Sequence, residues 1–303
     1  MRLTLPAPYD DRLLADEPLA KYTAARLGGP ADYLYIARES PQELAAVVEA
    51  AWAQAVPVRI LGGGANVLVN DVRVPGLVVV NSVSQAEFHA DHTCDVSSGH
   101  GLAVLARKCA ARALSGFEWA VSVPGTIGGA VVNNAGAHGG DMAGCLRTVD
   151  LLDAQSGRRT LTLADLDYRY RTSALKARAD RRFLVLSARL AFTPDDRNAI
   201  EARMGTFIAH RKRTQPPGAS LGSIFKNPPG DYAGRLIEAC GLKGLSIGGA
   251  QVSPVHANLF INTGSASAAD YLALVHQVQA EVARQTGVEL ETEIEVIGSE
   301  LAD

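Results

Sequence analysis

The chain has 303 residues, of which 47% are hydrophobic and 20% charged, and its 29 basic and 32 acidic side chains leave a net charge of −3. This length suits two or three domains with a substantial core, and the composition is that of a globular protein. The near balance of charge argues against nucleic-acid binding and against a basic patch for membrane surfaces.

No stretch approaches the roughly 18 apolar residues of a membrane span, and the N-terminus lacks the apolar segment of a secretory signal. The four cysteines, Cys94, Cys109, Cys145 and Cys240, form no C-x-x-C pair and have no zinc-site spacing. We therefore expect no metal site and no membrane association. Dispersed cysteines of this kind are typical of reduced core thiols in a cytoplasmic protein.

The N-terminal part of the chain alternates helix and strand. Ser40-Pro41-Gln42-Glu43 predicts a helix start with a capping box and a proline at the first helical position. Short apolar strands are predicted at Val58–Leu61 and Leu77–Val80, and a helix from Leu102 to Ser115 is expected to end at Gly116. This alternation indicates an α+β or α/β lobe.

The middle of the chain has a strand-rich pattern. Leu151-Leu152 and Leu161–Leu163 flank Gln155-Ser156-Gly157, which predicts a β-hairpin, and Phe183–Phe192 predicts a further strand. A helix then begins near Asn198 and ends in a basic run at 210–213. That run complements the helix dipole, and the alternative is that one of its cations meets an anionic substrate.

The C-terminal part holds one clear helix and a last strand. Ser267 and Asp270 form a capping box, and Gly287 closes the helix. The last strand is expected at Glu289–Ile297. The apolar stripe of the helix consists of Tyr271, Leu274, Val275, Val278 and Val282.

Two glycine-rich segments carry the strongest functional signal. Gly62-Gly63-Gly64-Ala65-Asn66 follows a strand, and glycines allow backbone N–H groups to approach a diphosphate closely. It is not the dinucleotide fingerprint, which would need glycine at Val67. The second segment, Val123–Ala137, has four glycines and two asparagines among small residues. A crowded backbone crossing would explain one such segment, but two of them favour one extended ligand, a dinucleotide-sized cofactor.

Together with Arg26-Leu27-Gly28-Gly29-Pro30-Ala31-Asp32, these segments resemble the FAD-binding domain of the UDP-N-acetylenolpyruvoylglucosamine reductase family. The resemblance covers about residues 20–298 and implies an α+β fold. It implies a two-lobed FAD-binding domain of the vanillyl-alcohol-oxidase/PCMH type at 18–194, with lobes 18–73 and 74–194, and a C-terminal α+β substrate-binding domain at 195–303. The implied cofactor contacts are Gly62, Gly63, Gly64, Ala65, Asn66, Pro124, Gly125, Thr126, Gly128, Gly129, Asn134 and Gly136.

The family's reaction, in peptidoglycan precursor synthesis, is the NADPH-dependent reduction of UDP-N-acetylglucosamine enolpyruvate to UDP-N-acetylmuramate through FAD. The resemblance implies that three residues carry it. Arg171 would hold the substrate carboxylate and stabilise its enolate, Ser223 would donate a proton to carbon, and Glu293 would act as stabiliser or proton relay. Glu291 would share a strand face with Glu293, and the family pattern alone selects the latter.

Further residues are implied to bind the nucleotide-sugar substrate: Tyr170, Lys226, Asn227 and His256. Lys226 is also a candidate cation for lowering the effective pKa of Ser223, and Asn258 is as open as His256 to a ligand contact. The chain departs from the family at Ala65, where serine is usual. The short spacing from Arg171 to Ser223 indicates a compact variant of the family.

Two other functions remain open from the sequence. One is another oxidoreductase of the same FAD superfamily, acting on a hydroxy acid or a sugar alcohol. The other is a flavin- or nucleotide-binding protein without catalysis. A hydrolase is rejected, because the G-x-S-x-G match at Gly218–Gly222 lacks the strand before it and the helix after it that a nucleophile elbow needs.

Overall fold

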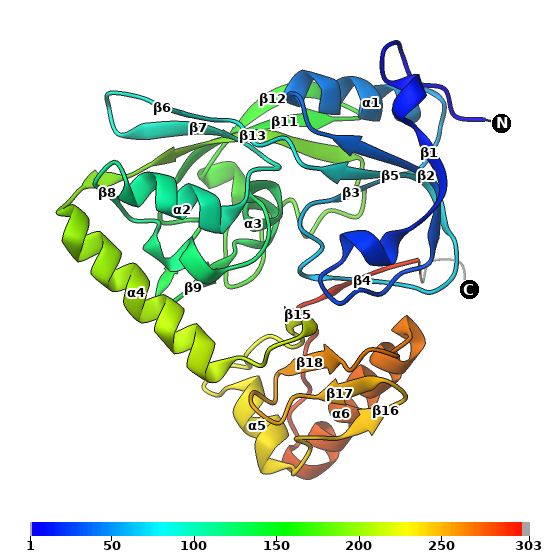
Figure 1. The fold of residues 1–303 in the computed structure, drawn as a ribbon, viewed down its shortest axis with the longest axis vertical. Helices are drawn as coiled ribbons and strands as arrows, with labels where there is room; N and C mark the ends of the chain where they lie inside the picture. The colour runs from blue at the N-terminus through cyan, green and yellow to red at the C-terminus, as the bar shows by residue number, and fades with distance from the viewer. Residues whose placement is uncertain (1, 299–303) are drawn as a thin grey trace. The chain divides into compact units, whose positions relative to one another are not determined.

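The computed structural model describes residues 2–298 and divides the chain into two compact units. Unit 1 comprises Met1–Leu14, Tyr33–Gly62 and Gly76–Arg211. Unit 2 comprises Ala15–Asp32, Gly63–Pro75 and Lys212–Asp303. Each unit therefore combines segments that are far apart in the sequence, as the colours of Figure 1 show. The functional domains expected at 18–194 and 195–303 stay predictions.

The first sheet has four strands in the order β1 (Leu14–Pro18), β2 (Pro30–Ala37), β5 (Val74–Asn81) and β3 (Val58–Leu61). The predicted strands at β3 and β5 are confirmed, and they run parallel with Val58 opposite Leu77. Their apolar side chains pack in one core cluster with helix α1 (Pro41–Ala53).

Helix α1 begins at the predicted N-cap, because the Oγ of Ser40 accepts the N–H of Glu43 at 3.1 Å. The predicted capping box is only half formed. The carboxylate of Glu43 accepts the N–H groups of Arg38 and Glu39, at 3.0 and 2.6 Å, and not that of Ser40. Glu43 is buried and also binds the hydroxyl of Tyr35, so a tertiary network replaces the local motif.

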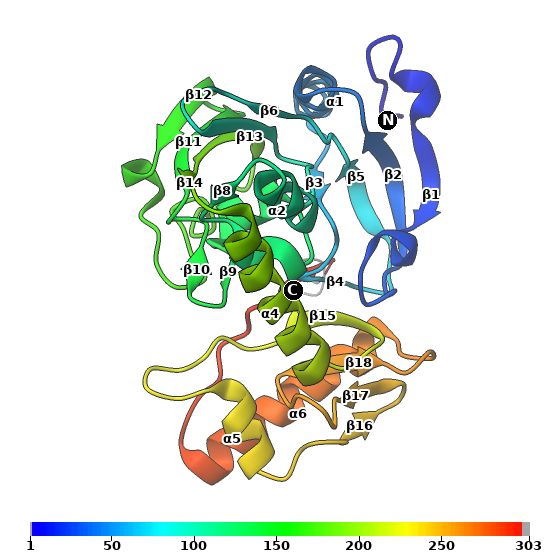
Figure 2. The same ribbon diagram turned by 60° about the vertical axis from the view of Figure 1, so that its left-hand side comes forward.

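The second sheet is antiparallel and lies wholly in unit 1. Its order is β12 (Gly157–Thr162), β11 (Leu146–Asp153), β13 (Phe183–Ala191), β7 (Thr93–Ser97) and β6 (Ala86–Phe88). The predicted hairpin is confirmed, with Asp153 opposite Gly157. Side chains alternate along a strand, so neighbouring residues of β13 face opposite sides of the sheet. Leu184 packs in the core cluster that contains α1, and Val185 packs in a second core cluster on the opposite face. Figures 1 and 2 show the sheet with α1 on one side and further helices on the other.

The helices of that other face are α2 (Leu102–Ala110), α3 (Ile127–Asn133) and α4 (Arg197–Thr214). The prediction for α2 was wrong at its C-terminus. The chain turns after Ala110, Ala113 adopts a left-handed φ of 55°, and Leu114 pairs with Pro194 in a two-stranded sheet. Leu114 is buried, so the tertiary core ends the helix before Gly116 is reached. The predicted helix from Asn198 through the basic run is confirmed as α4.

Unit 2 is built around a four-stranded antiparallel sheet in the order β15 (Ala219–Ser223), β18 (Leu259–Asn262), β17 (Ala250–Val252) and β16 (Ser246–Ile247). Helices α5 (Ala233–Ala239) and α6 (Ala268–Thr286) share a core cluster with it. The predicted caps of α6 are confirmed: Ser267 and Asp270 form a capping box, and Gly287 has a φ of 72°. All five residues of its predicted stripe are buried.

The predicted last strand was too long. Only Glu295–Ile297 forms a strand, β19, and it pairs in parallel with β4 (Val67–Val69). Before it, Thr292 makes an isolated bridge to Phe225. The segment changes partners between these contacts, so it is not one continuous strand. The rejected nucleophile elbow is also absent from the described fold, since Ser220 lies within β15 and pairs with Ile261.

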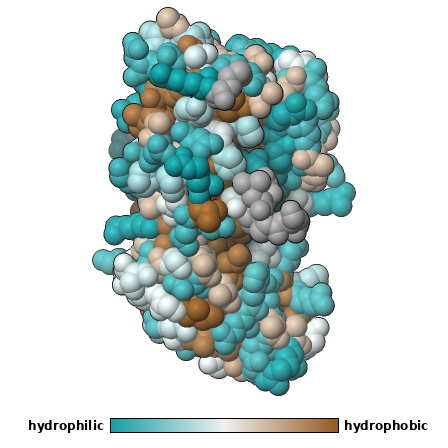
Figure 3. All heavy atoms as spheres, turned by 90° about the vertical axis from the view of Figure 1, so that its right-hand side faces the viewer, coloured by the Kyte–Doolittle hydropathy of each residue, from teal (hydrophilic) through white to brown (hydrophobic). Residues whose placement is uncertain are grey.

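The remaining short elements are η1 (Asp10–Arg12), η2 (Leu19–Tyr22), η3 (Glu118–Ser122), η4 (Ala164–Leu166), β8 (Leu114–Ser115), β14 (Thr193–Pro194), β9 (Gly136–Ala137) and β10 (Gly140–Asp141). Among the described residues, no helix is long and apolar enough to cross a membrane, and no group of three or more His, Cys, Asp or Glu side chains is placed to hold a metal. All four cysteines are free, and three are buried. Brown and teal side chains are interspersed over the face shown in Figure 3.

Candidate active site

The end of β3 and the second glycine segment are in contact within unit 1. A Cβ at Gly62 would lie 2.4 Å from Oγ1 of Thr126, a distance that real side chains do not reach. Gly62 therefore permits a close approach between two segments that are about sixty residues apart in sequence. The structure thus brings together two of the residues predicted to bind the cofactor.

The second glycine segment leaves backbone donors and space available. Gly125 has a φ of 114°, and a Cβ there would have no atom within 4 Å. The N–H groups of Ile127 and Gly128 donate to the backbone at His100 and Ser98. Within residues 2–298, no hydrogen bond engages the N–H groups of Gly125, Thr126 or Gly129. These donors remain able to bind an anionic group.

Arg171 lies against the same segment. Its Nη2 donates to the carbonyl oxygen of Gly136 at 2.5 Å, and its Nη1 is 3.5 Å from that of Asn134. Asn134 is buried and returns a hydrogen bond from Nδ2 to the carbonyl oxygen of Arg169 at 3.1 Å. The guanidinium also lies over the exposed ring of Tyr170, 5.1 Å from its centroid. Unit 1 therefore places the predicted arginine beside predicted cofactor residues.

The first glycine segment continues in unit 2, where it is packed tightly. A Cβ at Gly64 would lie 2.2 Å from the carbonyl oxygen of Tyr22, and Ala24 donates its N–H to the carbonyl of Gly64. Across the described chain, no hydrogen bond engages the N–H groups of Gly63, Gly64 or Ala65. These three consecutive donors remain able to bind an anionic group. The cofactor contacts predicted for them stay predictions.

The upstream motif 26–32 has a different task. A Cβ at Gly28 would lie 3.0 Å from Cβ of Val69, and one at Gly29 would lie 2.2 Å from the carbonyl oxygen of Asp71. Gly29 also donates its N–H to the backbone of Asn70. Both glycines therefore serve close backbone packing onto the strand that follows the first glycine segment.

A backbone hydrogen bond at Ile224 brings the segments that carry Ser223 and Glu293 together. The N–H of Glu293 donates to the carbonyl oxygen of Ile224 at 2.7 Å. The carbonyl oxygen of Glu293 in turn accepts from Nδ2 of Asn66 at 3.1 Å. Unit 2 therefore assembles the predicted serine, glutamate and asparagine, which come from three distant segments. No other described residue is hydrogen-bonded to the hydroxyl of Ser223, which leaves it available to a ligand.

The side chain and carbonyl oxygen of Asn258 hold the backbone of residues 224 and 225 in place. It is buried, its Nδ2 donates to the carbonyl oxygen of Phe225 at 2.8 Å, and its Oδ1 accepts the N–H of Phe225 at 2.9 Å. Its own carbonyl accepts the N–H of Ile224. Asn258 therefore holds the backbone beside Ser223, a position that its spacing in the sequence did not reveal.

The other predicted substrate residues are placed as follows. Lys226 forms an ion pair with the exposed carboxylate of Glu291. The two candidate glutamates therefore differ, because Glu291 pairs with Lys226 and Glu293 is the less exposed of the two. The Oδ1 of Asn227 accepts the N–H of Ala233 at the start of α5. The ring of His256 accepts the N–H of Asn258 at 3.2 Å, and its burial lowers its pKa.

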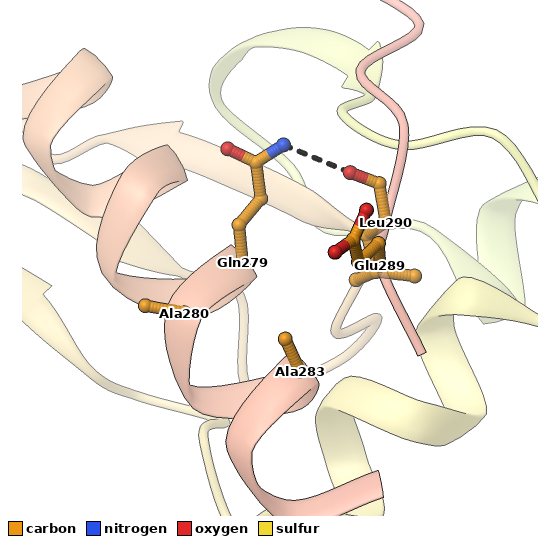
Figure 4. A pocket seen from close by; sticks show the side chains of 5 residues that line it. All are labelled: Gln279, Ala280, Ala283, Glu289 and Leu290. Carbon is orange, nitrogen blue, oxygen red and sulfur yellow. Dashed lines mark hydrogen bonds between the residues drawn. The ribbon is translucent and has the colours of Figure 1, made fainter. Parts of the chain in front are cut away.

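The described residues fit an FAD diphosphate. Two stretches of free N–H donors lie in glycine segments, and one of them has open space at Gly125 where a side chain would otherwise sit. A pocket of about 290 Å³ beside α6 is unrelated to this chemistry. It is lined by Gln279, Ala280, Ala283, Glu289 and Leu290, with Gln279 donating to Leu290 at 2.8 Å (Figure 4), and it contains none of the predicted site residues.

Comparisons with known proteins identify the domains of this chain. Residues 33–161 match the model of an FAD binding domain, and residues 214–297 match the UDP-N-acetylenolpyruvoylglucosamine reductase C-terminal domain. A UDP-N-acetylenolpyruvoylglucosamine reductase of Levilactobacillus brevis is 41% identical over 95% of this chain and 94% of the relative. One of Chloroflexus aggregans is 43% identical over 94% and 97%.

A solved structure is similar as well. The crystal structure of UDP-N-acetylenolpyruvylglucosamine reductase from Thermus caldophilus superposes with a TM-score of 0.78 and 35% identity, covering 94% of this chain and 98% of that one. The fold and its glycine segments define an FAD-dependent oxidoreductase, and the predicted α+β class is confirmed. Within that class, the chain belongs to the UDP-N-acetylenolpyruvoylglucosamine reductase family. These matches do not favour the alternative oxidoreductase that acts on a hydroxy acid or sugar alcohol.

Proposed function

We propose that this chain reduces UDP-N-acetylglucosamine enolpyruvate to UDP-N-acetylmuramate with NADPH, in cytoplasmic peptidoglycan precursor synthesis. The observation that carries the proposal is the backbone hydrogen bond from Glu293 to Ile224, which brings the segments of Ser223 and Glu293 together, because the reaction needs a proton donor and a carboxylate in one site. The names and the extent of the family matches support the same substrate.

Bound FAD would supply the hydride chemistry that links NADPH to reduction of the enolpyruvyl group. We assign the diphosphate to the N–H donors of Gly125, Thr126 and Gly129, and we propose that Gly63, Gly64 and Ala65 also contact FAD. The other predicted contacts at Gly62, Asn66, Pro124, Gly128, Asn134 and Gly136 belong to the same two segments. We also propose that residues 18–194 hold FAD and that 195–303 bind the substrate.

The residues of the chain then have separate tasks. Arg171 binds the substrate carboxylate, and its planar fork stabilises the negative charge that spreads into that group after the methylene carbon is reduced. Ser223 donates its hydroxyl proton to the adjacent carbon, which completes the lactyl ether. Glu293 stabilises the proton transfer or relays a proton back to Ser223. Tyr170, Lys226, Asn227 and His256 contact the nucleotide sugar.

Two half-reactions, measured separately without air, test the proposal. NADPH should bleach the flavin absorption of the wild-type protein, and the enolpyruvyl substrate should restore it. Ser223→Ala should leave bleaching intact while restoration slows by orders of magnitude, since only the second half-reaction needs the acid. In Arg171→Lys, the substrate should not restore the flavin absorption at the wild-type rate, because lysine lacks the planar fork. A wild-type flavin that the substrate fails to reoxidise would refute the proposed function.

A further inference from the structure

Arg171 belongs to a loop that two hydroxyl groups fasten to the C-terminal end of α3. The hydroxyl of Tyr168 donates to the carbonyl oxygen of Val131 at 2.7 Å, and Oγ of Ser173 donates to that of Val132 at 2.6 Å. The last carbonyls of a helix have no partner within it, so these two side chains complete the helix end. Ser173 is 2% exposed, and burial raises the pKa of Tyr168, which keeps its hydroxyl a neutral donor.

The loop would not hold its shape without such support. Arg171 has a φ of 55°, a left-handed conformation that is unfavourable for a residue with a Cβ and persists only when the surroundings impose it. Its carbonyl oxygen accepts from Nζ of Lys176 at 3.3 Å. The Oγ of Ser173 also accepts the N–H of Lys176, so Ser173 bonds in two directions.

Helix α3 joins this loop to the proposed FAD segment. It begins at Ile127, directly after Gly125 and Thr126, and ends at Asn133, where Asn134 adopts a left-handed φ of 43°. Its start is held by the bond from the N–H of Gly128 to Ser98, at 2.7 Å. One short helix thus carries donors for the cofactor at one end and the support of Arg171 at the other.

We propose that Tyr168 and Ser173 are positioning residues, which hold the guanidinium of Arg171 at a set distance from the FAD segment by docking its loop on α3. The inference rests on the proposed function, because it gives these hydroxyls a role in substrate reduction alone. It predicts that their loss acts through Arg171 and leaves the cofactor segment itself in place.

The test uses full-length holoenzyme carrying Tyr168→Phe or Ser173→Ala, each of which removes one hydroxyl and little else. Either change should slow reoxidation of the reduced flavin by the enolpyruvyl substrate about tenfold, the usual scale for a lost buried hydrogen bond. Reduction by NADPH should stay within about twofold of wild type. Tyr35→Phe is the matched control, since it removes a buried hydroxyl bonded to Glu43 at 2.7 Å in a different core cluster, and it should change neither rate.

A double-mutant cycle separates positioning from general structure. In an Arg171→Ala background, Tyr168→Phe should add no further loss, because the group that it positions is gone. An equal loss in both backgrounds, or a parallel fall of both half-reactions, would overturn the inference. If the wild-type enzyme does not turn over the substrate, the proposed function fails instead. In that case, hydrogen exchange at the amides of Ala174 and Lys176 tests whether the two hydroxyls dock the loop. The exchange must accelerate in both Tyr168→Phe and Ser173→Ala, and unchanged exchange overturns the docking role.

Discussion

Asn258 and Phe225 bind each other twice, through Nδ2 to the carbonyl oxygen and through Oδ1 to the N–H, at 2.8 and 2.9 Å. Both residues are buried, so neither backbone group has access to water. This reciprocal pair sets the backbone of the segment that carries Ser223.

Asn258→Ala should destabilise the protein by about 2–4 kcal/mol, since it strands two buried backbone groups. Urea unfolding followed by circular dichroism measures the change. The exposed Asn198→Ala should shift the unfolding free energy by less than about 0.5 kcal/mol. Equal effects of the two substitutions would show that the pair contributes nothing specific.

Gly62→Ala tests the contact between the two glycine segments. The new Cβ would meet Oγ1 of Thr126 at 2.4 Å, so the Thr126 side chain or the two segments must shift. We expect a loss of about 1–3 kcal/mol in stability and a fall in bound flavin, measured by thermal unfolding and by absorption after desalting. Adding Thr126→Ala should restore part of the stability.

Gly205→Ala provides the control for that substitution. Gly205 lies in α4, and a Cβ there would have no atom within 4 Å. Alanine is the better helix former, so this change should stabilise the protein by about 0.5–1 kcal/mol and leave flavin content unchanged. A destabilising Gly205→Ala would mean that the glycine substitutions report something other than crowding.

Asp153 predicts a stability change at acid pH. Burial alone would raise its pKa, but the hydrogen bond from Arg178 and the N–H groups of Gln155 and Ser156 lower it to about 2. A lowered pKa in the folded state stabilises the protein above the unfolded value, near 4, and that contribution disappears as the pH falls toward 2. Asp153→Asn should therefore be less stable by about 2 kcal/mol at pH 7, with the gap closing between about pH 4 and pH 2.

Denaturant unfolding at several pH values measures this gap. Asp11→Asn serves as the control, because Asp11 is exposed and its removal should change stability little at any pH. A gap for Asp153→Asn that stays constant down to pH 2 would contradict the linkage.

Glu293 and Glu291 offer a matched pair for catalysis. Glu293→Gln should slow substrate reduction about 10²- to 10⁴-fold, the range for a proton-transfer group, while NADPH still bleaches the flavin. Glu291→Gln should alter the rate only a few-fold, since that carboxylate is exposed and pairs with Lys226. Stopped-flow absorption measures both half-reactions, and comparable losses in the two variants would remove the special role of Glu293.

The sequence by itself determined the local features of this protein. The caps of α6 and the hairpin around Gln155-Ser156-Gly157 depend on contacts within a few residues. The strands β3 and β5 and the two glycine segments could be recognised from their own residue patterns, although their partners lie further along the chain. Such local features are encoded by residue type and spacing, and the ordered motifs among them were enough to indicate the family.

Only the tertiary structure decided which distant groups those segments meet. It sent the carboxylate of Glu43 to Arg38 and Glu39, ended α2 at Ala110, and left only Glu295–Ile297 of the expected last strand in a sheet. It likewise set Thr126 against Gly62, and Asn258 against Phe225. The partners in the last two pairs lie tens of residues apart. Their choice depends on burial and on the need to satisfy every buried polar group, which no local pattern of residues contains.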